Sequence, residues 1–363
     1  MTSTERVAVV GTGLMGTSIA MAALRAGCDV RGHDANPDVL ARARGRAGFQ
    51  AVEDLPRCVR DASLVFVCTP IGTIVDVAID VLSAAPEAIV SDVGSVKAHV
   101  VDEVERRLPG DLIRFVGGHP MGGSERSGPD GASATLLDGI VWVVTTTPRT
   151  DPVAALRLEA WVAAIGAQPI RIDPDRHDRT VAVVSHLPQV ASTALMGLAA
   201  LEEADEPEVL RLAAGGFRDL TRLAASSPAL WGDILLANRD ALARAIDAYV
   251  ARLEHLRDLV TGGRLADVEA AFAEAKRARL DLAAKPQVKA GVAVIQVPVP
   301  DRPGVLADLT AGLSERGVNI EDFQIVHSAE GGRGTVHLTV AIPDAPAAAD
   351  ALEARGYEPL RLA

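Results

Sequence analysis

The first candidate for chemistry is a histidine inside a glycine-rich segment. His119 lies in Gly117-Gly-His-Pro-Met-Gly-Gly-Ser-Glu125, directly after a run expected to be a β-strand. Open α/β sheets bind ligands at the carboxyl ends of their parallel strands, which is where we expect this loop. Because imidazole has a pKa near neutrality, His119 can accept a proton during turnover. The alternative is a histidine that only supports the loop.

A second segment has the spacing of a dinucleotide-binding turn. Gly11, Gly13 and Gly16 form a GxGxxG pattern after an apolar run and before a helical pattern. They would allow a tight turn, close approach of a pyrophosphate and close helix packing. Asp34 follows where a carboxylate would bind ribose hydroxyls and repel a 2′-phosphate, and Arg31 lies too early to bind that phosphate securely. NAD is therefore expected in preference to NADP; the alternative is a glycine-rich turn with a surface aspartate.

Ser95 lies in Asp92-Val-Gly-Ser-Val-Lys97, between an expected strand and an expected helix. A serine there either caps the helix or points its hydroxyl at a substrate. Both roles remain open from the sequence.

Further polar candidates lie in the second half of the chain. His186 and Gln189 stand one helical turn apart, with Pro188 between them predicting a kink. His186 fits a capping and packing role equally well. Arg218 and Arg222, also one turn apart, offer guanidinium groups to a carboxylate. The alternative for Arg218 is an ion pair with Asp219.

The elements that must position these residues change in kind along the chain. Short β-rich runs alternate with helical patterns up to residue 172, which predicts βαβ units with a parallel sheet. The expected strands are Arg6–Val10, Asp29–His33, Leu64–Thr69, Ala88–Asp92, Ile113–Gly117, Val141–Thr145 and Gln168–Ile172, with helices over Leu14–Ala26, Thr73–Ala84 and Val96–Leu108.

The remainder predicts an all-helical region and then a small β-α-β-β-α-β unit of ferredoxin-like type. Long apolar helical runs over Val181–Leu201 and Leu230–Leu259 suggest packing against a partner chain. The predicted domains are 1–174, 175–285 and 290–363, with Lys285-Pro286-Gln287 as a linker.

Composition narrows the class of protein. The net charge of −12 and the pI of about 5.2 argue against nucleic-acid binding and anionic membranes. Three widely spaced cysteines without a CxxC predict neither disulfides nor a metal site and fit a reducing cytosol. We find no signal-peptide pattern and no uninterrupted apolar run of membrane-spanning length, so a cytoplasmic location is expected.

Taken together and in order, five segments resemble the prephenate dehydrogenase (TyrA) family along essentially the whole chain. These segments are GTGLMG, DVGSVK, GHPMGGSE, VSHLPQ and GFRDLTR with a following tryptophan. The resemblance implies a Rossmann-type NAD-binding domain, an all-α dimerisation domain and a C-terminal ACT domain. It further implies a homodimer or higher homo-oligomer.

The resemblance also implies roles for individual residues. His119 would be catalytic, with Ser95 contacting substrate, His119 and the nicotinamide side, and Arg222 would clamp a substrate carboxylate. The other implied substrate-binding residues are Ser124, Glu125, His186, Gln189, Asp219 and Trp231. The implied cofactor-binding set is Gly11, Thr12, Gly13, Leu14, Met15, Gly16, Asp34, Thr69 and Pro70.

One departure from the family pattern bears on the substrate. The family often reads SHLPH, whereas this chain has Gln189 in place of the second histidine. That position faces the side chain that is a keto acid in prephenate and an amino acid in arogenate. The preference between the two substrates therefore stays open.

In the C-terminal unit, Asp301-Arg-Pro-Gly304-Val305 and Asn319-Ile320 resemble the ligand-binding turns of ACT domains. This implies an amino-acid effector, with tyrosine or phenylalanine the natural candidate, although the unit could instead only assist oligomerisation.

The resemblance implies NAD-dependent oxidative decarboxylation of prephenate to 4-hydroxyphenylpyruvate in tyrosine biosynthesis, or of arogenate to tyrosine. A β-hydroxyacid dehydrogenase is disfavoured because residues 175–201 contain no lysine. A non-catalytic sensor of NAD and amino acids is disfavoured by the joint presence of His119, Ser95 and Arg222.

Overall fold

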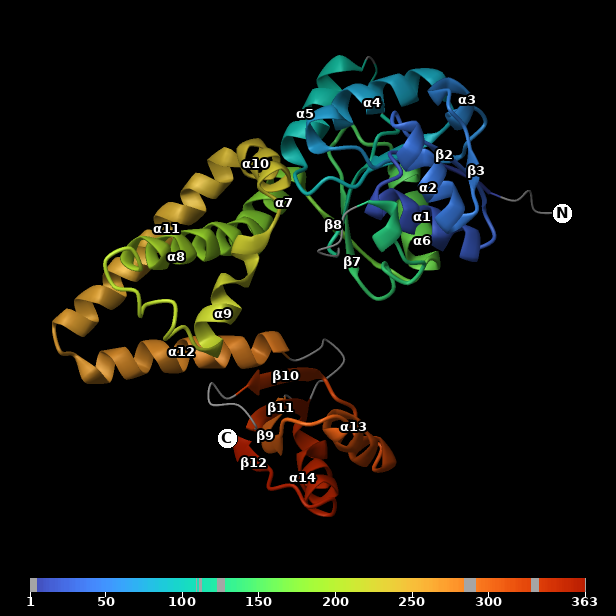
Figure 1. The fold of residues 1–363 in the computed structure, drawn as a ribbon. Coiled ribbons are helices and arrows are strands. Elements are labelled where there is room, and N and C mark those ends of the chain that lie inside the picture. Colours follow the sequence, from blue (N-terminus) through green and yellow to red (C-terminus); the bar gives the residue numbers. More distant parts are fainter. Residues whose placement is uncertain are drawn as a thin grey trace. The chain divides into compact units, whose positions relative to one another are not determined.

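The structure is a computed structural model that describes residues 5–108, 110, 113–122, 128–283, 292–327 and 333–362. The chain divides into two compact units, residues 1–191 with 225–247 and residues 192–224 with 248–363 (Figure 1). The first unit carries the nucleotide-binding fold and the second ends in the ferredoxin-like unit.

A five-stranded parallel sheet organises the first unit. Its strand order is β3-β2-β1-β4-β5, so the order reverses beside β1, where doubly wound sheets bind ligands. The strands are β1 Arg6–Val10, β2 Asp29–His33, β3 Gln50–Ala51, β4 Leu64–Val67 and β5 Ile89–Asp92. The four predicted strands of this sheet are confirmed, with shorter ends for β4 and β5, and the two-residue β3 was not predicted. The strand predicted over Ile113–Gly117 is wrong, because that run forms isolated bridges and β6 begins only at Gly117.

A second, three-stranded sheet holds the candidate histidine. It has the order β6-β7-β8, with bounds Gly117–Pro120, Val141–Thr145 and Gln168–Ile172. We expected His119 at the carboxyl end of a parallel strand, but β6 pairs antiparallel with β7 and places His119 opposite Val143. Only the residues before it run parallel to β5, through a bridge between Val90 and Phe115. The short run therefore contacts both sheets, which its sequence did not indicate.

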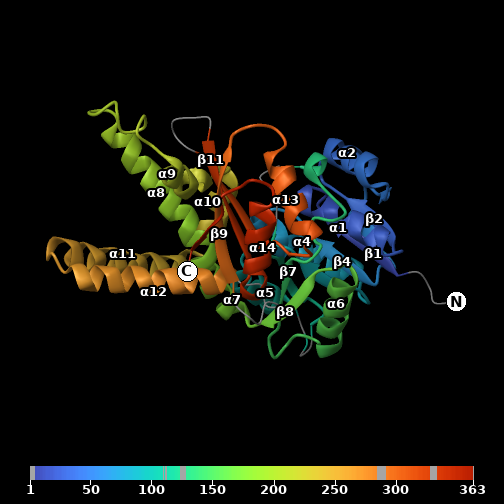
Figure 2. The same ribbon diagram turned by 90° about the horizontal axis from the view of Figure 1, so that it is seen from below.

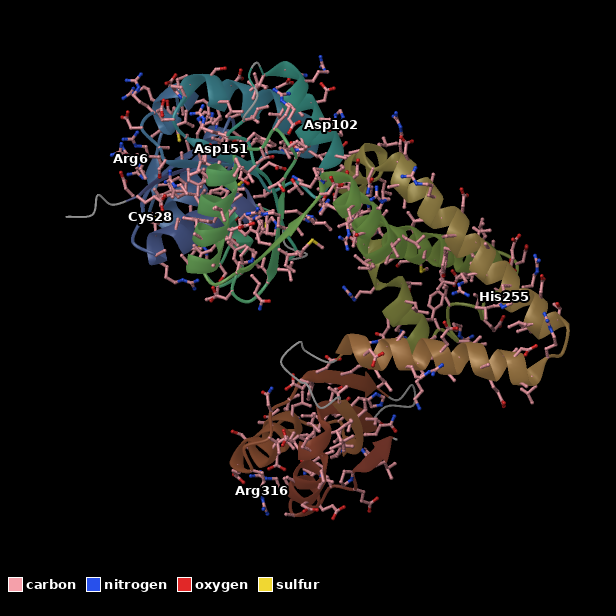
Figure 3. All side chains as sticks on the ribbon, turned by 180° about the vertical axis from the view of Figure 1, so that it is seen from behind. Arg6, Cys28, Asp102, Asp151, His255 and Arg316 are labelled. Atoms are coloured by element: carbon pink, nitrogen blue, oxygen red, sulfur yellow. The ribbon has the colours of Figure 1, made fainter. Side chains whose placement is uncertain are left out.

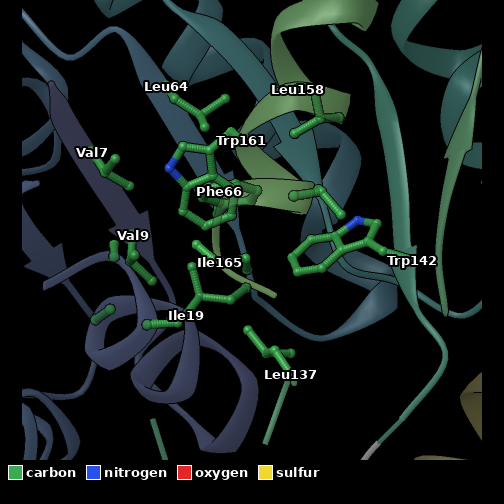
Figure 4. Packing of buried hydrophobic residues seen from close by; sticks show 14 of the residues in the cluster. Val7, Val9, Ile19, Leu64, Phe66, Leu137, Trp142, Leu158, Trp161 and Ile165 are labelled. Carbon is green, nitrogen blue, oxygen red and sulfur yellow. The ribbon is translucent and has the colours of Figure 1, made fainter. Parts of the chain in front are cut away.

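Period-two alternation in β1 divides the core into two layers. Val7 and Val9 pack in one cluster, and Ala8 and Val10 pack in the other. The first cluster also contains Phe66, Trp142 and Trp161 (Figure 4), so much of the small aromatic content lies in one place. The helices of this part are α1 Leu14–Arg25, α2 Pro37–Ala47, α3 Leu55–Val59, α4 Ile71–Ala84, α5 Ala98–Arg107 and α6 Pro152–Ala164. Asp151 caps α6 by accepting a 2.9 Å hydrogen bond from Val153 N (Figure 3).

Residues 174–283 form helices with no strand among them, as predicted. They are α7 Pro174–Val181, α8 Leu187–Glu202, α9 Gly215–Thr221, α10 Pro228–Ala237, α11 Arg239–Thr261 and α12 Leu265–Ala283. The irregularity expected from Pro188 takes the form of a π-helical segment over Ala182–His186. A proline cannot donate the usual backbone hydrogen bond, and a π-segment accommodates that loss. The expected run over Leu230–Leu259 is interrupted at Asn238.

The C-terminal part of the second unit has the predicted βαββαβ order. Its sheet has the order β10-β11-β9-β12, and α13 and α14 pack on it through one apolar cluster (Figures 1 and 2). The bounds are β9 Val292–Pro300, α13 Val305–Glu315, β10 Asp322–His327, β11 Arg333–Ala341, α14 Ala345–Glu353 and β12 Leu360–Leu362. The predicted linker Lys285-Pro286-Gln287 lies outside the described residues.

Within the described residues, the helical run Pro174–Glu202 is long and apolar enough to cross a membrane by length and composition alone. We had expected no such run. Five of its polar side chains are nevertheless buried in protein, namely His177, Asp178, His186, Gln189 and Ser192.

All three cysteines are free, in agreement with the prediction that they form no disulfide. Cys28 is half-buried (Figure 3), as is Cys68, and Cys58 is buried. Burial raises the pKa of the Cys58 thiol to about 12, so this side chain is inert near neutral pH.

Candidate active site

The glycine-rich turn between β1 and α1 has the geometry that a dinucleotide requires. Gly11 has φ +91° and lies so close to β4 that a Cβ would fall 2.7 Å from the Cys68 carbonyl. A Cβ on Gly16 would lie 1.9 Å from the Gly11 carbonyl oxygen, so α1 packs against the turn only with glycine there. A Cβ on Gly13 would meet nothing within 4 Å. The turn is therefore closed towards the protein and open at Gly13.

Asp34 is held at this turn by two backbone N–H groups and one hydroxyl. Its Oδ2 accepts hydrogen bonds from Thr12 N (2.7 Å) and Thr12 Oγ1 (3.1 Å), and its Oδ1 accepts one from Asn36 N (2.9 Å). Thr69, which follows β4, has a buried hydroxyl without a hydrogen-bond partner in the described part of the chain. A carboxylate with spare lone pairs and an orphaned hydroxyl next to an open glycine turn are groups that a ribose and a pyrophosphate would satisfy.

Arg31 points away from this site. Its guanidinium donates to the carbonyl oxygens of Arg57 (3.3 Å) and Arg60 (3.1 Å), at the end of α3. These two bonds engage the Arg31 guanidinium at the end of α3.

A buried ion pair lies beneath the histidine segment. Lys97 Nζ donates to Asp92 Oδ2, and both side chains are 0% exposed. The same carboxylate accepts from Gly94 N (2.9 Å) and from Gly118 N (3.1 Å). Burial lowers the pKa of the Lys97 ammonium, while the charge of Asp92 opposes this shift. Asp92 thus fixes the backbone next to His119.

His119 is paired with a second histidine that sequence reasoning did not select. Its Nδ1 lies 2.9 Å from Nε2 of His177, and His177 Nδ1 lies 2.7 Å from Oδ1 of Asp178. Burial, together with His177, Lys97 and His186, lowers the pKa of His119 well below its usual 6.5. His119 is therefore a neutral imidazole at physiological pH, the form that accepts a proton.

Asp178 joins α7 to α5. Its Oδ1 accepts from Lys97 N (2.7 Å) and its Oδ2 from Ala98 N (2.9 Å), at the start of α5. The cap of α5 therefore comes from Asp178 and not from Ser95. Of the two roles left open for Ser95, the capping role is wrong because α5 begins later than predicted. The half-buried Ser95 hydroxyl makes no hydrogen bond to the residues that the structure describes, and its role towards a substrate stays a prediction.

His186 lies in the same part of the first unit. Its Nδ1 accepts a 3.2 Å hydrogen bond from Asn238 Nδ2, which also donates to the Asp178 carbonyl oxygen (2.9 Å). The buried Nε2 of His186 has no partner among described residues, and its ring stands edge-on to Trp231 at 6.2 Å. The half-buried Trp231 and the buried Gln189 belong to this unit too.

The remaining predicted substrate residues lie elsewhere. Asp219 is on α9 and Arg222 follows it in a 3-10 turn, both exposed and both in the second unit. The described residues show no ion pair between Arg218 and Asp219. Ser124 and Glu125 lie outside the described residues.

Three residues of the site escaped the sequence analysis as functional candidates: His177, Asp178 and Asn238. The adjacent His177 and Asp178 at the start of a helix were the available signal, since both are polar types that a helical core rarely buries. Asn238 gave no signal, because it lies inside the single helical run predicted over Leu230–Leu259.

Acid should destabilise the fold through His186. Burial lowers the pKa of this imidazole to about 4, below its usual 6.5. Between these values the unfolded chain binds a proton that the folded chain excludes, so stability falls as the pH drops from 7 to 5, by about 2 kcal/mol from this group. Urea unfolding at pH 7 and at pH 5 should show a smaller loss of unfolding free energy for His186→Gln than for wild type.

The exposed His255 on α11 (Figure 3) provides the control. His255→Gln should keep the wild-type loss. Equal losses in wild type and His186→Gln would contradict the assignment to His186.

Comparison with known proteins agrees with this architecture. Three family descriptions match: "Prephenate dehydrogenase, nucleotide-binding domain" over residues 19–170, "Prephenate dehydrogenase, dimerization domain" over 173–274, and "ACT domain" over 293–356. Prephenate dehydrogenase of Bacillus subtilis is 32% identical over 349 residues, covering 94% of this chain and 93% of the relative.

Two solved structures are similar in fold and sequence. One is prephenate dehydrogenase from A. aeolicus in complex with hydroxyphenyl propionate and NAD+, with 30% identity, a TM-score of 0.71, and 77% and 99% of the two chains covered. The other is Synechocystis arogenate dehydrogenase, with 30% identity, a TM-score of 0.68, and 76% and 98% covered. With a Rossmann-type domain, a helical domain and an ACT domain in this order, the chain belongs to the prephenate dehydrogenase family.

Proposed function

We propose that this protein catalyses the NAD-dependent oxidative decarboxylation of prephenate to 4-hydroxyphenylpyruvate, in tyrosine biosynthesis. The observation that supports it most is the neutral, half-buried His119, held by His177 in a unit with an open glycine-rich turn. His119 would accept the proton of the substrate's C4 hydroxyl as hydride leaves C4, and loss of the ring carboxylate as carbon dioxide would give the aromatic product.

NAD, when bound, supplies the hydride acceptor. The residues proposed to hold it are Gly11, Thr12, Gly13, Leu14, Met15, Gly16, Asp34, Thr69 and Pro70. The open Gly13 and the Asp34 carboxylate fit a pyrophosphate and a ribose respectively. Ser95 would align the substrate hydroxyl next to His119.

Arogenate is the alternative substrate, and Gln189 is the residue on which we base the comparison. Its neutral amide can donate and accept hydrogen bonds, so it suits the keto acid of prephenate without supplying the negative charge that an ammonium group would favour. Proteins named for both substrates are among those similar to this chain.

A spectrophotometric assay at 340 nm tests the proposal. The full-length protein is given prephenate or arogenate, each with NAD or NADP. We expect the largest kcat/KM for prephenate with NAD. Faster turnover of arogenate would move the assignment to arogenate dehydrogenase, and no turnover of either substrate would overturn it.

Arg222→Ala should raise the KM for the substrate about 10- to 100-fold, with a smaller change in kcat, because a guanidinium–carboxylate contact contributes about 1.5–3 kcal/mol. The exposed Arg211→Ala is the matched control. A KM equal to that of wild type would remove Arg222 from the site.

Asp34→Asn should weaken NAD binding about 10- to 100-fold and narrow the preference for NAD over NADP, because the amide no longer repels a 2′-phosphate. Fluorescence titration with both cofactors measures this, with the exposed Asp38→Asn as control. An unchanged ratio of the two affinities would contradict the role of Asp34.

We further propose three domains (1–174, 175–285 and 290–363), a cytoplasmic location, and a homodimer formed through the helical domain. Exposed apolar residues on its helices, such as Leu198, Leu201 and Tyr249, support self-association.

The ACT domain would bind an amino-acid effector, for which tyrosine is our candidate. A pocket beside Asp301 and Val305, next to Gly304 with φ +91°, supports this. Asn319 and Ile320, at the start of the following strand region, would complete the effector site.

A further inference from the structure

Three side chains form a hydrogen-bonded row that leads from His119 into the protein. His119 Nδ1 contacts His177 Nε2 (2.9 Å), and His177 Nδ1 contacts Asp178 Oδ1 (2.7 Å). His177 is 1% exposed and Asp178 is 5% exposed, so solvent does not compete for these bonds. Every proton in the row must therefore be placed by the protein itself.

The direction of the row is set at Asp178. Its two oxygens accept hydrogen bonds from Lys97 N and Ala98 N, at the amino end of α5. An ionised carboxylate only accepts, and the helix dipole at this end favours its negative charge. The ring nitrogen of His177 that faces Asp178 must then be the donor, so His177 carries its proton on Nδ1.

The same logic continues to His119. A neutral His177 with its proton on Nδ1 has only a lone pair on Nε2, which faces His119. His119 must donate to it from Nδ1, and this leaves His119 Nε2 without a proton. That nitrogen is the one that can act as the base, whereas the opposite tautomer of His119 would have no lone pair to offer outside the row.

We propose that His177 and Asp178 are positioning residues that hold His119 in the tautomer with its proton on Nδ1, and that they compensate its charge after it has taken a proton. This inference rests on the proposed function, in which His119 is the base. The bond that breaks is the substrate O–H and the one that forms is H–Nε2 of His119. The resulting positive charge is balanced through His177 by the Asp178 carboxylate.

The groups around the row show why a positive charge on His119 requires compensation. Burial, His177, Lys97 and His186 all oppose a positive charge on His119, and Asp178 is the carboxylate within the row. Without His177, His119 would lose both its fixed tautomer and the link to that charge.

The protonated ring nitrogen of His119 can be measured directly in the wild-type protein. Histidine labelled with ¹⁵N in the ring is incorporated into the full chain, and the His119 signals are identified by their loss in His119→Gln. At about pH 8, above the usual histidine pKa, we expect the proton of His119 on Nδ1. A proton on Nε2 would overturn the proposal, whatever the activity of the protein.

Two substitutions of His177 distinguish a hydrogen-bonding role of this side chain from a role in packing alone. His177→Leu removes the acceptor for His119 and should lower kcat about 100-fold while KM stays within about twofold. His177→Gln retains an acceptor oxygen and should recover at least about tenfold of that loss. A kcat for His177→Leu close to that of wild type, or a loss for His177→Gln as large as for leucine, would contradict the proposal.

The role of Asp178 is tested through its dependence on His177. Asp178→Ala should lower kcat in the wild-type background and have much less effect in the His177→Leu background, because the two act as one unit. Additive losses would overturn the coupling. The exposed Asp175→Ala on the same helix should leave kcat unchanged.

Failure of the proposed function would look different. If neither prephenate nor arogenate is oxidised, the function is wrong and the tautomer of His119 still decides the arrangement of the row. If the wild-type enzyme is active and His119 carries its proton on Nε2, the proposed function holds and the proposed role of the hydrogen-bonded row is wrong.

Discussion

Replacing His119 by asparagine should lower kcat by about 10²- to 10⁴-fold, the contribution usual for a positioned general base. The side chain is the neutral imidazole of the site, with its Nδ1 already engaged by His177. Asparagine removes the nitrogen that would accept the hydroxyl proton. It leaves the glycine-rich turn and Asp34 untouched, so the dissociation constant for NAD should stay within about twofold.

Stopped-flow or steady-state assays at 340 nm measure the rate, and fluorescence titration measures NAD binding. The assignment of His119 as the base requires that kcat falls while the dissociation constant for NAD stays close to that of wild type. Turnover of His119→Asn comparable to wild type would remove His119 from catalysis, and a parallel loss of NAD binding would indicate a damaged domain rather than a missing base.

Replacing Lys97 by methionine should cost about 3–5 kcal/mol of stability, the usual cost of breaking a buried ion pair. Both partners are fully buried, so Asp92 would be left as a charged group without its counter-ion. Its remaining bonds from Gly94 N and Gly118 N do not neutralise that charge. Urea unfolding at constant pH provides the measurement.

Two further variants make this result specific. Asp92→Asn combined with Lys97→Met removes both charges and should recover part of the lost stability. Arg106→Met breaks an ion pair with Glu103 on the same helix, but this pair is at the surface and should be worth about 1 kcal/mol or less. If Lys97→Met and Arg106→Met cost the same, burial of the Lys97–Asp92 pair would not be the cause.

The sequence was sufficient for the parts of the fold that have local signals. The bounds of β1, β2, β7 and β8 were predicted as observed, because a short apolar run between turn residues is a local signal of a strand. The position of Asp34 next to the turn from Gly11 to Gly16 could also be predicted, because the spacing within a βαβ unit brings these two segments together. The order of the C-terminal unit followed from its alternation of strands and helices.

Two expectations failed where a neighbour distant in the chain intervened. Capping of the helix by the nearby Ser95 was one of two roles left open, but Asp178, 81 residues after Lys97, supplies the cap of α5. The strand of His119 was expected to be parallel, but β7 pairs with it in the opposite direction. A short run of residues contains no information on which strand will lie beside it.

What the sequence by itself determined is the inventory: a glycine turn with its aspartate, a histidine in a glycine-rich segment, and three successive kinds of domain. What only the tertiary structure decided is the state of that histidine. His177 lies 58 residues from His119, and Asn238 lies 52 residues from His186, so no periodicity relates them. Hydrogen bonds of this kind form when α7, α5 and β6 pack together, and that packing selects the nitrogen of His119 that remains able to take a proton.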